Sequence, residues 1–228
     1  MKGLLSRILF LLPMILLVSC GTAASAIYYQ GFAPSDASEG VALLSPVSCI
    51  YYLDNKGNES YDDSLSISSE LMMTDLIARQ GLPITATLPL DSLQKEESVA
   101  FMRYASSNKP VALLEAPIPS VLDSLLEANN QRYGLLLYTE GFTRDHKQYV
   151  TELITAATFG VLLAIVTMGA VYTYSDSREY AAGVSVAILD SDYDRVVFYN
   201  SIPVREANPM SEKHMGKFMT SLFKDFNK

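Results

Sequence analysis

Three observations predict an α/β domain of the mixed α+β kind, with one mixed sheet flanked by helices, an apolar insert and a C-terminal amphipathic helix. Strand-like apolar segments alternate with helical patterns in the first half of the chain. Strand-like segments then follow one another, and an amphipathic helix closes the sequence. Strands that alternate with helices favour a sheet with helices packed on it, and strands that follow one another directly favour pairing between those strands. One mixed sheet flanked by helices therefore accounts for both halves of the chain.

The first half begins with an apolar strand over residues 41–53, which a turn-forming cluster at 54–58 closes. Pro46 lies inside this segment and indicates a bulge or an edge, because proline cannot donate to a sheet ladder. A helix is predicted to begin between residues 60 and 63, where hydroxyl and carboxylate side chains can cap free amides, and to end at Gly81.

Further elements follow in the same alternation. Residues 82–90 predict a second strand and residues 91–104 a second helix with acidic residues near its start. A short apolar segment at 111–114 is compatible with another strand. Pro119 suits the first turn of a third helix, which ends near residues 129–130.

The second half contains the clearest strand patterns. Residues 133–142 are apolar on both faces, as expected for a central strand covered on two sides. Residues 183–189 and 195–202 predict a hairpin joined by a polar loop. A final helix is predicted with Asn208 as its cap and Pro209 at its first position. Its apolar stripe consists of Met215, Phe218, Met219, Leu222, Phe223 and Phe226.

The first nineteen residues have the composition of an export signal. Lys2 and Arg7 form a positive end, and residues 8–18 form an apolar run shorter than the roughly 20 residues of a membrane span. Leu17-Val18-Ser19-Cys20 follows and resembles the lipobox of bacterial lipoproteins, in which the cysteine is acylated. We therefore expect lipid attachment, including palmitate, at Cys20, whose thiolate is nucleophilic enough to accept it.

Removal of this signal defines the mature chain. Residues 20–40 are mostly small or polar and predict a lipidated terminus with a flexible tether, followed by a single domain over 41–228. Cys49 then has no intrachain disulfide partner and is expected to be buried as a small apolar residue. The mature net charge moves from −8 to −10, because 15 basic residues remain against 25 acidic ones. This balance argues against nucleic-acid binding.

The insert, residues 150–176, contains an uncharged stretch of 23 residues from 153 to 175. Three interpretations stay open: a helix or helical hairpin that buries itself on the domain, a membrane-seeking or self-associating element, and a single membrane span. A span is hard to reconcile with flanking strands that belong to one sheet. The candidate interaction or membrane residues are Leu153, Phe159, Leu162, Leu163, Ile165, Val166, Met168 and Tyr172.

No constellation of residues predicts a catalytic or metal site, and no cofactor is expected. His146 and His214 are expected on the surface. Glu140, near the end of a buried strand, is expected in a structural ion pair or at an exposed strand end. Asp190, Asp192 and Asp194 alternate as in a calcium loop, but a bidentate glutamate is missing at the required spacing, so a polar hairpin loop is preferred.

Several of these features together resemble small bacterial envelope lipoproteins whose α/β domain is similar to the N-terminal domain of the Tol-system periplasmic protein and to the curli-secretion pore lipoprotein. They are residues 17–20, the strand ending in Glu140-Gly141-Phe142, the insert, the strand pair around Asp190 and residues 196–199, and the terminal helix. The resemblance implies a non-enzymatic role in envelope assembly or export, in some members as a ring. The insert lacks the alternating pattern of pore-forming strands.

The sequence therefore predicts a membrane-tethered bacterial lipoprotein that acts as an accessory, assembly or export factor through protein–protein interaction. We expect it in the cell envelope, anchored by lipid to the outer membrane and facing the periplasm, as a homo-oligomer or with an envelope protein partner. The alternatives are a lipid-anchored enzyme acting on envelope polymers, which would need a cleft gathering Glu140, Asp145 and His146, and a small-ligand-binding module.

Overall fold

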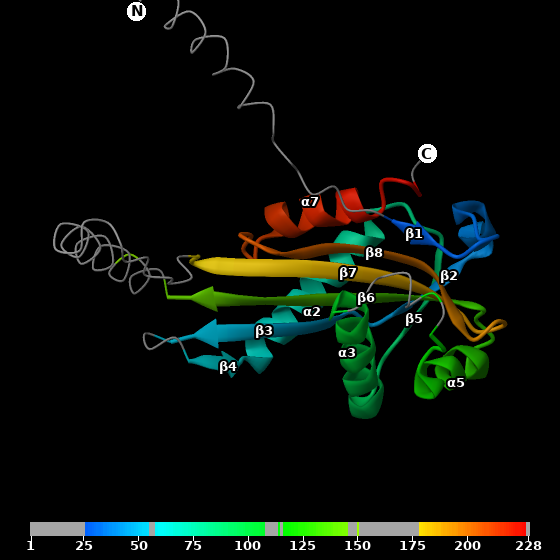
Figure 1. The fold of residues 1–228 in the computed structure, drawn as a ribbon, viewed down its shortest axis with the longest axis horizontal. Coiled ribbons are helices and arrows are strands. Elements are labelled where there is room, and N and C mark those ends of the chain that lie inside the picture. The colour runs from blue at the N-terminus through cyan, green and yellow to red at the C-terminus, as the bar shows by residue number, and fades with distance from the viewer. Residues whose placement is uncertain are drawn as a thin grey trace, which may run out of the picture.

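The computed structural model describes residues 26–54, 58–107, 114, 116–145, 150 and 178–226, and within them forms one mixed eight-stranded sheet with four helices (Figure 1). The strands follow the order β1-β8-β7-β6-β2-β5, and β3 pairs with both β6 and β4. This confirms the predicted fold class. The strand bounds are β1 Ile27–Tyr28, β2 Val41–Leu44, β3 Val47–Leu53, β4 Glu59–Tyr61, β5 Ile84–Leu88, β6 Tyr133–Arg144, β7 Tyr180–Asp190 and β8 Arg195–Arg205.

The predicted first strand is divided at Pro46 into β2 and β3, which both run parallel to β6. Strand β2 pairs with the start of β6 and, on its other side, with β5, whereas β3 pairs with the rest of β6 and with β4. Pro46 supplies no amide hydrogen, which explains why the ladder is interrupted there. At Pro46, the strand on the side away from β6 therefore changes from β5, which pairs with β2, to β4, which pairs with β3.

Strands β6, β7 and β8 form the long antiparallel part of the sheet. The pairing of β6 with β7 is regular from Tyr133 opposite Asp190 to Thr143 opposite Tyr180. Gly141 allows this close pairing, because a Cβ there would lie 2.2 Å from the carbonyl oxygen of Ala181. The predicted hairpin of β7 and β8 is confirmed, and both strands extend beyond the predicted bounds.

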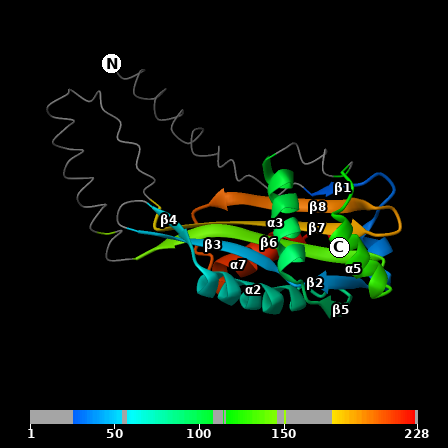
Figure 2. The same cartoon turned by 90° about the horizontal axis from the view of Figure 1, so that it is seen from below.

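Two helices cover each face of the sheet (Figure 2). Helices α2 (Asp63–Ala78) and α7 (Glu212–Leu222) pack on one face through Met73, Ile77 and the stripe of α7. Helices α3 (Ser92–Ser107) and α5 (Ser120–Ala128) pack on the other through Met102 and Leu122. Each face therefore has its own core.

Serine side chains join α2 closely to β3. The Ser66 hydroxyl accepts a hydrogen bond of 3.0 Å from the backbone N–H of Ile50, and the hydroxyls of Ser48 and Ser69 lie 3.0 Å apart. All three serines are buried. Small hydroxyl side chains at these helical positions satisfy buried polar groups of the strand while the helix stays near the sheet.

The structure corrects two predictions about local structure. Part of the expected tether belongs to the folded domain, because β1 pairs with β8 and a 3-10 helix, η1 (Pro34–Glu39), follows it. A strand of two residues is too short to show a sequence period. The cap of α7 is Ser211, whose hydroxyl accepts from the backbone N–H of His214, while Asn208 accepts from Met210 in the preceding turn.

Strand β8 lies at one edge of the sheet and is only partly covered. Strand β1 pairs with Tyr199 and Phe198, and the backbone N–H of Tyr29 donates to Val197. Farther along β8, Pro203 is exposed. A proline on an edge strand removes one of the donors that the edge would otherwise present.

Among the described residues, no helix has the length and apolarity needed to cross a membrane. The uncharged stretch of residues 153–175 and the predicted export signal lie outside these residues. The predicted apolar segment at 111–114 is described only at Leu114.

Candidate functional site

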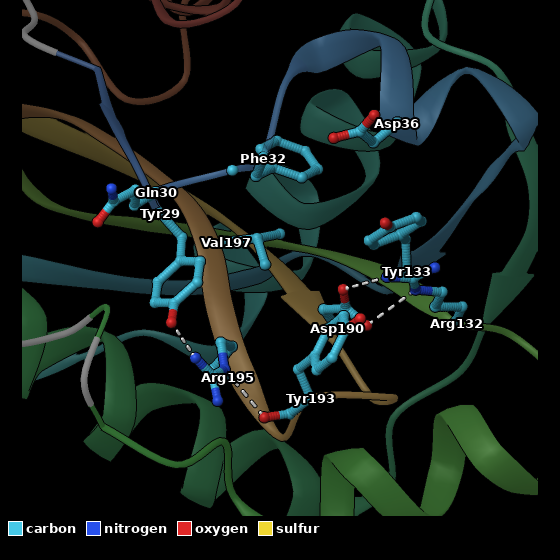
Figure 3. Close-up of a pocket in the computed structure, with 11 residues that line it drawn as sticks. Tyr29, Gln30, Phe32, Asp36, Arg132, Tyr133, Asp190, Tyr193, Arg195 and Val197 are labelled. Carbon is cyan, nitrogen blue, oxygen red and sulfur yellow. Dashed lines mark hydrogen bonds and ion pairs between the residues drawn. The ribbon is translucent and has the colours of Figure 1, made fainter.

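A cavity of about 400 Å³ lies at the end of the sheet where β6 begins and β7 turns into β8 (Figure 3). Its walls come from segments far apart in the chain: the stretch after β1, helix η1, the start of β6 and the β7–β8 turn. Aromatic and charged side chains dominate the lining. They are Tyr29, Phe32, Asp36, Arg132, Tyr133, Asp190, Tyr193 and Arg195, with Gln30, Gly31 and Val197 completing it.

Two arginines and three tyrosines form a stacked ladder along this cavity. The Arg132 guanidinium lies 4.8 Å from the ring centre of Tyr133 and 5.3 Å from that of Tyr193. The Arg195 guanidinium lies 4.6 Å from the ring centre of Tyr29 and 5.7 Å from that of Tyr193. Each contact is a cation–π interaction, so each guanidinium group contacts two aromatic rings.

Arg132 is neutralised by carboxylates. Its Nε and Nη2 donate to the two carboxylate oxygens of Asp190 at 3.1 and 3.0 Å, and its Nε lies 3.1 Å from Asp192. The Asp190 side chain is 2% exposed and also accepts from the backbone N–H of Asp192. Burial and the Asp190 carboxylate raise the pKa of neighbouring Tyr133, which keeps its hydroxyl protonated.

Arg195 has different partners. Its Nε donates to the carbonyl oxygen of Tyr193 at 3.0 Å, and its Nη1 donates to the hydroxyl of Tyr29. Neither partner carries a negative charge. Within the described residues, no carboxylate forms an ion pair with Arg195.

A second polar cluster lies beneath α3 on the other part of β6. The Arg103 Nε donates to the Tyr138 hydroxyl at 3.0 Å, and this hydroxyl lies 3.1 Å from a carboxylate oxygen of Glu140. Tyr138 is 1% exposed, and burial raises its pKa far above the ordinary value. Glu140 is therefore bonded to a tyrosine rather than presented as a general acid. Burial also raises the pKa of the Cys49 thiol, as expected for a buried, unreactive cysteine.

The other predicted candidates have structural contacts. His214 is half-buried and its Nδ1 accepts from the backbone N–H of Asn208, so it supports the turn before α7 and is not a solvated surface residue. Asp194 accepts from the backbone N–H of Ile118, and its φ of 47° is one that aspartate tolerates in tight turns. Asp190 and Asp192 form the ion pairs of the hairpin with Arg132, and no group of potential metal ligands occurs among the described residues.

The remaining predictions concern residues outside the described ranges. Cys20 and His146 lie there, as does the contact surface proposed for the insert: Leu153, Phe159, Leu162, Leu163, Ile165, Val166, Met168 and Tyr172. These assignments stay predictions.

Sequence reasoning missed the residues of the ladder. Arg132-Tyr133 and Tyr193-Asp194-Arg195 each join an arginine to a nearby tyrosine, and this repetition was the available signal. It gives no indication that Tyr29, more than a hundred residues away, completes the stack.

Comparisons with known proteins give only distant likenesses. No protein family model matches the sequence, and no curated protein matches it. A solved PelC dodecamer from Paraburkholderia phytofirmans is similar with a TM-score of 0.41 and 10% identity, over 89% of this chain and 95% of that chain. A protein of the DUF4136 family from Bacteroides thetaiotaomicron has a TM-score of 0.29 and 9% identity, over 90% of this chain and 93% of that one. At these scores neither likeness carries an argument about function.

Proposed function

We propose that this chain is a lipid-tethered protein of the bacterial cell envelope that acts as an accessory, assembly or export factor through protein–protein interaction, with the insert as its contact element. The lipobox at residues 17–20 supports the tether. One structural observation supports the role of the insert: β6 and β7 remain paired until Thr143 and Tyr180.

This pairing restricts how the insert can leave the domain. The backbone N–H of Arg144 donates to the carbonyl oxygen of Glu179 at 3.1 Å, so both ends of the connecting segment start from adjacent points. Paired antiparallel residues lie about 5 Å apart, whereas a single membrane crossing would separate its ends by about 30 Å. This geometry argues against the single-span interpretation. An insert that leaves and returns at one end of the sheet can be offered to a partner, to a second copy or to the membrane surface.

The size of the protein in solution tests the contact role. A chain beginning at Gly21 is compared with one in which residues 146–177 are replaced by a short Asn-Gly turn, which suits the paired strand ends. We expect the intact form to self-associate or to require detergent, and the shortened form to be a folded monomer. Two detergent-free monomers would contradict the contact role. A shortened form that does not fold would place the insert in the core and would also contradict it.

The tether is tested separately in the full precursor. Cys20→Ser should abolish palmitate labelling and move the protein from the membrane fraction to the soluble fraction. Cys49→Ser is the matched control, because Cys49 is a buried free thiol. Retention of label by Cys20→Ser would refute the tether.

A further inference from the structure

The cavity of the Tyr-Arg ladder contains an arginine, Arg195, that forms no ion pair with a carboxylate among the described residues. Arg132 has two carboxylate partners, whereas the Nε and Nη1 of Arg195 are bonded to neutral oxygens. Arg195 is half-buried, and a partly desolvated charge gains from an ion of opposite sign. Arg195 therefore keeps its charge available for an anion that enters the cavity.

The Arg195 guanidinium is already positioned for such an anion. Contacts with the rings of Tyr29 and Tyr193 and two hydrogen bonds, from Nε and Nη1, restrict its movement. A guanidinium has five N–H donors, of which these bonds use two, and its remaining donors suit the two oxygens of a carboxylate. Because the group is already ordered, little conformational entropy is lost on binding.

The other lining residues narrow the class of anion. Asp36 and Asp190 also line the cavity, so a doubly charged phosphate would meet more repulsion than a singly charged carboxylate. Tyr29, Phe32 and Tyr193 supply aromatic surface for an apolar group attached to the anion. A volume of about 400 Å³ lies in the range of pockets for small molecules.

We propose that this cavity binds a small organic monocarboxylate, with its carboxylate on Arg195 and its apolar part against the aromatic residues. This ligand-binding role goes beyond the protein–protein function proposed above and does not depend on the tether or the insert.

Binding is tested on the chain beginning at Gly21, by following its NMR spectrum during titration with benzoate. A probe of this size should bind with a dissociation constant on the order of 1 mM and shift the resonances of Tyr29 and Tyr193. Neutral benzamide has the same shape and should bind at least about tenfold more weakly, because it lacks the charge that pairs with Arg195. Inorganic phosphate should leave these resonances unchanged.

Variants locate the binding group. Arg195→Gln should weaken benzoate binding about tenfold or more, and Arg195→Lys should retain part of the affinity because it keeps the charge. Arg79→Gln is the matched control, since Arg79 is an exposed arginine paired with Glu212 outside the cavity. Thermal unfolding of each variant verifies that it is folded. The proposal is overturned if benzoate up to about 50 mM gives no saturable shift, if benzamide binds equally well, or if folded Arg195→Gln and Arg195→Lys both bind benzoate like the parent protein.

Discussion

Replacing Arg132 with alanine should lower the free energy of unfolding by about 2 kcal/mol, because it leaves the Asp190 carboxylate buried without a cation. Breaking a fully buried ion pair costs about 3 to 5 kcal/mol. Asp190 is 2% exposed, but the Arg132 side chain is 44% exposed, so solvent screens part of the interaction. The remaining bond from the Asp192 backbone N–H to Asp190 reduces the cost further. The expected loss therefore lies below the fully buried range.

Urea denaturation of the chain beginning at Gly21 measures this effect. A loss of about 2 kcal/mol corresponds to a midpoint lower by about 1 M for a typical slope of about 2 kcal/mol per M. Asp192→Ala is the control, because Asp192 is 62% exposed and its pair with Arg132 should contribute less than about 1 kcal/mol. Equal midpoints for the Arg132→Ala and Asp192→Ala variants would show that the buried pair does not stabilise the turn.

Three further predictions concern other parts of the fold. Asp62→Ala should cost about 1 kcal/mol in urea denaturation, because the Asp62 side chain caps α2 by accepting from the N–H of Leu65; an unchanged midpoint would argue against this cap. Burial and nearby carboxylates raise the pKa of Asp123, so its ionisation opposes folding as the pH rises above the unfolded-state pKa of about 3.9. Asp123→Asn should therefore raise the melting temperature at pH 7 but not at pH 3. Equal increases at both pH values would show that the ionisation of Asp123 is not the cause. Gly141→Val should cost about 3 kcal/mol or more, because the new side chain would meet the carbonyl oxygen of Ala181; a folded variant of unchanged melting temperature would refute the close pairing.

The elements with long periodic patterns could be predicted from the sequence. The first half of β6, residues 133–138, appears as an apolar run because helices cover it on both faces. The hairpin appears as two apolar runs around an aspartate-rich turn. The stripe of α7 is visible because four of its apolar residues are buried on one side. In each case burial in the core requires apolar residues at regular spacing, and this spacing is visible in the sequence.

Features that depend on tertiary pairing could not be predicted. Pro46 was expected to mark a bulge or an edge, but the identity of the two outer neighbours, β4 and β5, is decided only in the folded sheet. Strand β1 exists because β8 pairs with it, since two residues cannot show a period. The ladder joins Tyr29 to Arg195 across 166 positions, and nothing local to either residue indicates that contact.

The exposed end of β8, residues 203–205, has a consequence for how this protein behaves when it is concentrated at a surface. Lipid tethering would confine many copies to two dimensions, where an unpaired sheet edge meets identical edges often. Continuous edge-to-edge hydrogen bonding is the first step of β aggregation. Pro203 interrupts the donors on that edge where β1 no longer covers it. On tethered, crowded copies this proline would therefore oppose the joining of one domain's sheet to another's.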